Sequence, residues 1–316
     1  MSTTTNHSKH ILILSLILLT GLIINLTACQ TTNPQLSHDA DAMQVTVSIL
    51  PQAYFVERIG GEAVEINVMV GPGEEAHTYE PSPEQMITLS DSVIFFTIGV
   101  EYEEIWVPRF KDINPDMTII DSAQGIERHL TLETHTHGSE DLEEDIDDDD
   151  HAEQHFDPHV WLAPDNGKII AENVLQALNE SFPENSAVFN ENFTRLMADI
   201  DALDAQIETT LTGNNRRKFM VFHPAWAYFA DQYNLTQIPV QIGGQDPSAR
   251  EMAELILIAQ EEQIQVIFVQ PTFSTADAEA IAKEIGAQIA VIDPLARNWL
   301  ENLETVANAF ATALNN

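Results

Sequence analysis

The sequence contains a single cysteine, Cys29, so no disulfide can form within the chain. Basic side chains are scarce: 13 Lys and Arg stand against 50 Asp and Glu, which gives a formal net charge of −37. Such a surface repels nucleic acid and attracts cations, so we expect no nucleic-acid partner, although a solvating role explains the acidity equally well. No phosphate-binding Walker loop is present, so any ATP-driven step belongs to another protein.

The N-terminal residues have the features of a targeting segment. Lys9 precedes an apolar run over residues 11–24, which is too short to span a bilayer comfortably and has the length of a signal-peptide core. Ala28 then precedes Cys29, as in the bacterial lipoprotein signal, where the cysteine becomes a lipid-bearing N-terminus. An ordinary secretion signal with a chance cysteine is the alternative. We expect residues 1–29 to be a lipoprotein signal peptide and 30–42 a polar tether, which places the protein outside the cytoplasm on a membrane surface.

From Met43 onward, strand-like and helix-like stretches alternate, which predicts an α/β fold with parallel sheets covered by helices. The predicted strands are 44–49, 64–70, 93–98 and 117–120 in the first half, and 218–222, 237–241, 266–270 and 288–292 in the second. Between the halves, apolar residues recur at steps of three and four from Phe189 to Leu211, which indicates one long helix. We interpret this helix as a rigid connection between two lobes, with an ordinary surface helix as the alternative.

The predicted domain organisation follows from this pattern. An N-terminal α/β lobe spans 43–183, a linking helix 184–212, and a C-terminal α/β lobe 213–316. An acidic, low-complexity segment over 133–154 interrupts the first lobe, and we expect it to be disordered or loosely held. It carries histidines, so it is either an accessory segment that collects metal ions or a solubilising insertion.

Three histidines and one aspartate stand where a ligand site is expected. His77 lies just past the predicted strand that ends at Val70, and His223 and Asp293 directly follow two strands of the second half. His159 lies between the acidic segment and the next apolar stretch. In open α/β sheets, ligands bind beyond the carboxyl ends of the strands, so we expect these four side chains to face one cleft.

Three imidazoles and one carboxylate suit Zn²⁺ in tetrahedral geometry, whereas Mn²⁺ prefers sets richer in oxygen. Each residue also has an ordinary alternative: a solvated loop histidine, or an aspartate that forms a turn before proline. Asp157 is better suited to a turn, or to orienting a ligand, than to binding the ion itself. Because the imidazoles must be neutral to bind, metal affinity should fall as the pH drops through the histidine range.

Four motifs carry a resemblance to a known family. They are GPG at 71–73 with HTYEPSP at 77–83, DPHVWL at 157–162, FHPAW at 222–226, and IDPL at 292–295. In this order and spacing, from Met43 to the C-terminus, the chain resembles the zinc-uptake solute-binding proteins of bacterial ABC transporters. The resemblance implies that His77, His159 and His223 bind the metal, with Asp293 as a possible carboxylate ligand.

The resemblance also implies two lobes that close to a limited extent around Zn²⁺ and deliver it to a membrane permease driven by a cytoplasmic ATPase. Relatives specific for manganese or iron typically have Glu at the third ligand position, so His223 favours zinc. Some zinc-binding members have Glu immediately before the first histidine, where this chain has Ala76. The fourth ligand is therefore open among Asp293, Glu74, Glu75 and water.

Other functions compete with this interpretation. A manganese or iron receptor could use the same scaffold, and an extracytoplasmic zinc hydrolase could also use three histidines with an open fourth position. The sequence has no His-Glu-x-x-His helix, which argues against the hydrolase. Surface adhesion, a further possibility, has no discriminating residue. We expect a monomeric zinc receptor without enzymatic activity.

Overall fold

The computed structural model describes residues 42–130, 156–214, 216–241, 245–272 and 276–315. The predictions for the signal peptide, for nearly all of the tether and for the acidic segment with its histidines fall outside these residues. The described residues from Ala42 onward belong to one compact unit. Within the described ranges, no helix has the length and apolarity needed to cross a membrane.

The first half contains a four-stranded parallel sheet with strand order β2-β1-β3-β4. Its strands are β1 (Met43–Ile49), β2 (Val64–Val70), β3 (Ile94–Thr97) and β4 (Thr118–Asp121), and its helices are α2 (Leu50–Gly60), α3 (Pro83–Ser90) and α4 (Tyr102–Ile113). Residues 45–49 of β1 are buried without alternation, as expected for a central strand with helices on both faces. Helix α3 begins at Pro83 because Ser82 and Gln85 form a reciprocal capping box.

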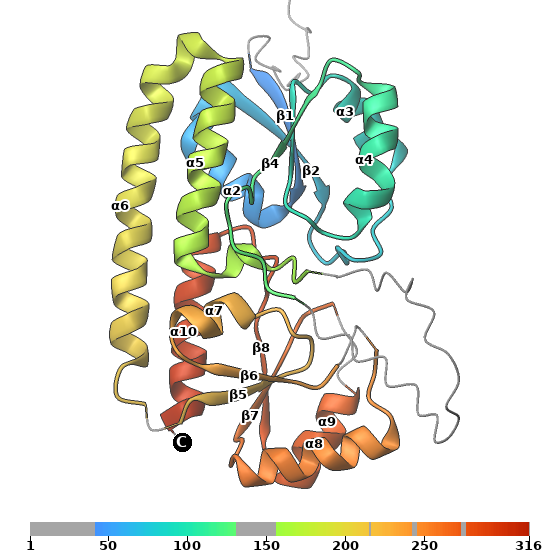
Figure 1. Ribbon diagram of the computed structural model, residues 1–316, viewed down its shortest axis with the longest axis vertical. Coiled ribbons are helices and arrows are strands. Elements are labelled where there is room, and N and C mark those ends of the chain that lie inside the picture. Colours follow the sequence, from blue (N-terminus) through green and yellow to red (C-terminus); the bar gives the residue numbers. More distant parts are fainter. Residues whose placement is uncertain (1–41, 131–155, 215, 242–244, 273–275, 316) are drawn as a thin grey trace, which may run out of the picture. The chain divides into compact units, whose positions relative to one another are not determined.

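The second half repeats the arrangement, with strand order β6-β5-β7-β8 in a second parallel sheet. Its strands are β5 (Lys218–Val221), β6 (Thr236–Pro239), β7 (Val266–Val269) and β8 (Gln288–Val291), and its helices are α7 (Ala227–Gln232), α8 (Ala249–Glu261), α9 (Ala276–Ile285) and α10 (Trp299–Asn315). Two parallel sheets flanked by helices confirm the predicted fold class (Figure 1).

A long helix, α6 (Ser186–Leu211), connects the halves. It follows α5 (Pro164–Ser181) and a short 3₁₀ turn, η4 (Pro183–Asn185). Its buried stripe comprises Phe189, Leu196, Ile200, Leu203, Ile207 and Leu211. Helix α6 packs against α2 and α5 of the first half and against α10 of the second, so it is the connecting helix that the sequence predicts (Figure 1). The exact lobe boundaries remain predictions.

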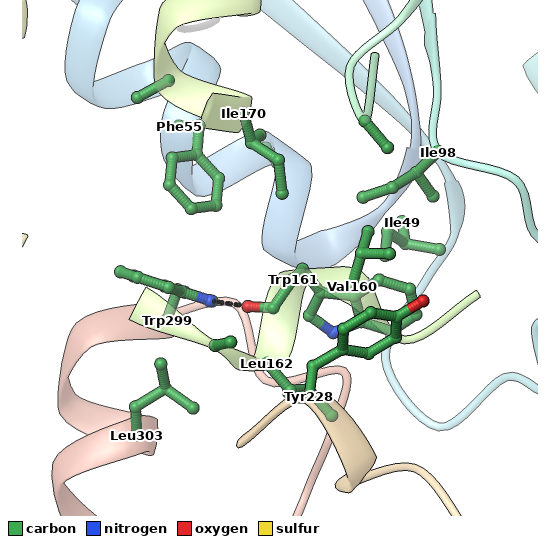
Figure 2. Packing of buried hydrophobic residues seen from close by; sticks show 14 of the residues in the cluster. Ile49, Phe55, Ile98, Val160, Trp161, Leu162, Ile170, Tyr228, Trp299 and Leu303 are labelled. Atoms are coloured by element: carbon green, nitrogen blue, oxygen red, sulfur yellow. Dashed lines mark hydrogen bonds between the residues drawn. The ribbon is translucent and has the colours of Figure 1, made fainter. Parts of the chain in front are cut away.

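Two buried tryptophans fix the short turn η3 (Val160–Leu162), which follows His159. The Trp161 indole donates to the Pro294 carbonyl at 2.7 Å. The Trp299 indole donates to the Trp161 carbonyl at 2.6 Å, as Figure 2 shows. Only glycine leaves room beside them, because a Cβ at Gly167 would lie 2.6 Å from the Trp299 ring. The turn therefore gives His159 a rigid base.

A buried carboxyl group, that of Glu103, ties together the ends of two strands. It accepts a hydrogen bond from the Ser48 hydroxyl in β1, and others from the backbone N–H groups of Ile98 (3.0 Å) and Gly99 (2.8 Å) after β3. Burial raises the pKa of Glu103 from 4.5 to about 7. The folded chain therefore binds this proton more tightly than the unfolded chain does.

We expect Glu103 to make the stability of the metal-free protein fall as the pH rises from about 4.5 to about 7. Full ionisation of this one group lowers the free energy of unfolding by about 3 kcal/mol. The Glu103→Gln variant should lose this part of the pH dependence, whereas the exposed neighbour variant Glu104→Gln should retain it. Urea denaturation at pH 5 and pH 8 measures the difference. Equal slopes for wild type and Glu103→Gln would contradict the assignment.

Candidate metal centre

The structure brings three of the four predicted site residues together. His77 lies in the loop between β2 and α3, His159 precedes η3, and His223 follows β5. One ring nitrogen from each histidine lies within 4.8 Å of the other two. The ring centroids are 5.0 to 5.6 Å apart, and the Nε2 atoms of His77 and His223 are 3.2 Å apart. Such spacing is compact enough for one metal ion.

Among the described residues, Asp293 lies outside the group that the three histidines form. Its Oδ1 accepts a hydrogen bond from the Leu295 N–H at 2.9 Å, and its backbone carbonyl accepts one from the Asn302 amide at 2.7 Å. Among the described residues, the group of possible ligand atoms that all lie within 4.8 Å of one another comes from the three histidines, and no carboxylate oxygen belongs to it. In this structure Asp293 closes the turn after β8, and its role as a metal ligand stays a prediction.

Carboxylates hold two of the imidazoles at their Nδ1 atoms. Glu101 Oε2 lies 2.6 Å from His77 Nδ1, and Asp157 Oδ1 lies 2.7 Å from His159 Nδ1. A carboxylate is an acceptor, so we assign the ring proton to Nδ1 in both histidines. Each ring therefore presents the lone pair of Nε2. Asp157 has the orienting role that the sequence favoured for it.

An amide holds the third imidazole. Gln241 Oε1 lies 3.3 Å from His223 Nδ1, while Gln241 Nε2 donates to Asp246 Oδ1 at 3.0 Å. The Asp246 carboxylate can only accept, so it fixes which end of the Gln241 amide faces the ring. His223 consequently also carries its proton on Nδ1 and presents Nε2.

The electrostatics differ between the first and third histidines. Burial lowers the pKa of His223 to about 2, assisted by the neighbouring imidazoles, so this ring stays neutral. Burial also lowers the pKa of His77, but the hydrogen bond and charge of Glu101 outweigh burial, and the net pKa is raised. Protons therefore compete with a metal ion for His77 more strongly than they do at an ordinary histidine, which agrees with weaker binding at low pH.

Two of the histidines, His77 and His159, border a small recess. Its wall includes His77, His159, Trp161, Glu75 and Gln270. The recess lies where the loops after β2 and β3 meet the segments that follow β7 and β8. The site thus forms at strand carboxyl ends of both sheets, as parallel α/β topology predicts.

Two side chains that orient the histidines, those of Glu101 and Gln241, were not predicted from the sequence. Glu101 was assigned only to a helix, and Gln241 only to a strand end. Both follow parallel strands, β3 and β6, so their positions at strand carboxyl ends were a usable signal. Their partners, however, are 24 and 18 residues away in sequence, and nothing local indicates those pairings.

Two linked α/β lobes with a cluster of histidines at the strand ends define a metal-binding solute receptor. The sequence profile of the family described as "ZnuA: Zinc-uptake complex component A periplasmic" matches residues 45–313, and the chain belongs to this family. Membership confirms the predicted kinship with zinc-uptake solute-binding proteins and the predicted function of a zinc receptor for import. The family is extracytoplasmic, and it is a family of transport components.

The relatives agree with this assignment. The chain is 27% identical over 287 residues to the high-affinity zinc uptake system protein ZnuA of Bacillus subtilis (strain 168), covering 89% of this chain and 88% of the relative. It is 28% identical over 286 residues to the zinc-binding lipoprotein AdcA of Streptococcus pneumoniae (serotype 4, strain TIGR4). That match covers 89% of this chain, which spans only 55% of AdcA.

A solved structure gives the same fold. A ZnuA deletion mutant with zinc bound superposes with a TM-score of 0.78 at 39% identity, over 87% of this chain and 99% of that one. The fold prediction is therefore confirmed, and zinc is confirmed as the ligand of the family.

We expect Asp157→Asn to weaken zinc binding, because the neutral amide keeps an acceptor but loses the charge that polarises His159. Loss of such an outer partner lowers metal affinity by about 10- to 100-fold. Competition with a chromophoric chelator measures the dissociation constant. The exposed variant Asp116→Asn is the matched control and should bind as wild type. An unchanged affinity for Asp157→Asn would show that His159 needs no charged partner.

Proposed function

We propose that this chain captures one Zn²⁺ ion with the Nε2 atoms of His77, His159 and His223 and delivers it to a membrane permease driven by an ATPase. The single observation that carries the proposal is the orientation of the rings. Each Nδ1 lies beside an acceptor, so Nε2 is the ring nitrogen with which each histidine would bind one ion. This arrangement exists before the ion arrives, which reduces the ordering needed on binding.

The donor set favours zinc over manganese. Three neutral imidazoles are borderline-soft nitrogen ligands, which suit Zn²⁺, whereas Mn²⁺ prefers carboxylate and water oxygens. The carboxylates of Glu101 and Asp157 stay in the outer shell, where they hold imidazoles. We propose that the ion is bound and released without chemistry.

Membrane attachment is the second part of the proposal. A lipid-bearing Cys29 followed by the polar tether 30–42 would hold a monomeric two-lobe receptor, 43–183 and 213–316, beside its permease. The name of the relative AdcA, a zinc-binding lipoprotein, supports this attachment. Labelling with a fatty-acid analogue tests it: a Cys29→Ser variant should lose the label.

We expect the protein without its signal peptide to bind one zinc ion with nanomolar or tighter affinity, as buried multi-ligand zinc sites do. His223→Ala should weaken binding by at least about 100-fold, because a core ligand matters more than an outer partner. His129→Ala is the control, since its ring pairs with Asp231 outside the group of three. Calorimetry or chelator competition measures both. Unchanged affinity in His223→Ala would refute the ligand assignment.

Hydrolytic activity is the outcome that would favour an enzyme. If the zinc-loaded protein cleaved esters or phosphoesters, and His223→Ala abolished that cleavage, the receptor proposal would be incomplete.

Deletion of residues 133–154 should leave the tight site intact, since all three proposed ligands lie outside it. The segment is rich in His, Asp and Glu, so we expect only weaker, additional zinc binding to be lost. Titration of both proteins with zinc compares the stoichiometries. Loss of the tight site in the deletion variant would mean that the segment supplies primary ligands.

A further inference from the structure

A tyrosine of the second half of the molecule reaches the loop of the first half that carries His159. Tyr228 lies on α7, and its side chain is buried. We infer that Tyr228 is a positioning residue for zinc binding, because its hydroxyl fixes the backbone from which the Asp157 carboxylate holds the His159 ring. The inference rests on the proposed function, which takes His159 as a metal ligand.

The Tyr228 hydroxyl is bonded to residues on either side of the acidic segment. It donates to the backbone carbonyl of Asp157 at 2.9 Å, and it accepts the backbone N–H of His129 at 3.0 Å. The N–H of Asp157 donates in turn to the carbonyl of His129 at 2.9 Å. One oxygen atom from α7 therefore fixes two separate stretches of the first half, and Asp157 is held at both its N–H and its carbonyl.

The side chain of Asp157 transmits this fixed position to His159. Its Oδ1 accepts the backbone N–H of His159 at 2.9 Å and lies 2.7 Å from the ring Nδ1. Pro158, between the two residues, restricts the connecting backbone further. Asp157 and His159 are both buried, so a shift of the Asp157 backbone displaces the imidazole as well.

The contact crosses from one half of the molecule to the other. Helix α7 packs against η3, the turn after His159, and Figure 2 shows Tyr228 at this junction. Without the hydroxyl, the Asp157 carbonyl and the His129 N–H would lose a shared partner in a buried place, which is unfavourable. Separation of α7 from residues 157–159 would have the same effect. The affinity for zinc therefore depends on how the two halves are arranged.

The test removes the same hydroxyl from two tyrosines of one helix end. Tyr228→Phe keeps the ring and should weaken zinc binding by about 5- to 20-fold, at the low end for outer partners because Tyr228 acts through Asp157. Tyr233→Phe is the matched control, since its buried hydroxyl donates to Asp204 of α6 at 2.7 Å instead. It should bind within about twofold of wild type. Chelator competition measures both dissociation constants.

Two further measurements separate positioning from a general loss of stability. The visible spectrum of the Co²⁺-substituted protein reports on donor geometry, so it should change in Tyr228→Phe and stay unchanged in Tyr233→Phe. In an Asp157→Ala background, which lacks the carboxylate but keeps the backbone, Tyr228→Phe should alter the affinity by less than about twofold. His129→Ala should bind as wild type, because it keeps the backbone N–H that Tyr228 accepts.

Two outcomes would overturn the inference alone. Wild-type affinity and an unchanged Co²⁺ spectrum in Tyr228→Phe, beside weak binding in His223→Ala, would leave the receptor intact and show that the hydroxyl positions nothing. An undiminished effect of Tyr228→Phe in the Asp157→Ala background would show that Tyr228 acts by another route. Unchanged affinity in His223→Ala would instead refute the proposed metal centre, and the inference would fall with it. Thermal unfolding of each metal-free variant verifies that the fold is retained.

Discussion

The hydrogen bonds at the Nδ1 atoms of three histidines are the interaction on which the site depends. Without them, each imidazole could carry its proton on either nitrogen and rotate about its side-chain bonds. Glu101, Asp157 and Gln241 remove that freedom, and Nε2 is then the atom with which each ring would bind a metal ion under the proposed function. An ion then meets donors that are already close together.

The repeated topology explains how residues so far apart in sequence meet. Both sheets have the same permuted strand order, and their strands are parallel, so the loops at the carboxyl ends gather the polar side chains. Helix α6 packs against both halves and joins them. The indoles of Trp161 and Trp299 then fix the turn after His159 to segments of the second half (Figure 2).

Much of this could be predicted from the sequence, and the failures have physical reasons. His77 and His223 each follow an apolar stretch that the sequence predicts to be a strand. Because alternating strands and helices predict parallel strands, the sequence also indicated that both histidines lie at strand carboxyl ends. The long helix was predicted to within two residues of its observed start, since its stripe is regular. The partners Glu101 and Gln241 were not predicted, because a hydrogen bond across 24 or 18 residues has no local periodicity. Asp293 was predicted as a possible ligand by its position after a strand; its Oδ1 accepts the N–H of Leu295 in this structure, and its role as a ligand stays a prediction.

Diffraction from crystals of the zinc-loaded protein, recorded at and below the zinc absorption edge, tests the central claim most directly. The anomalous difference should place one ion among His77, His159 and His223, about 2.0–2.1 Å from the Nε2 atom of each. An ion bound through Nδ1, or one bound elsewhere while these three rings keep their hydrogen bonds to Glu101, Asp157 and Gln241, would contradict the account.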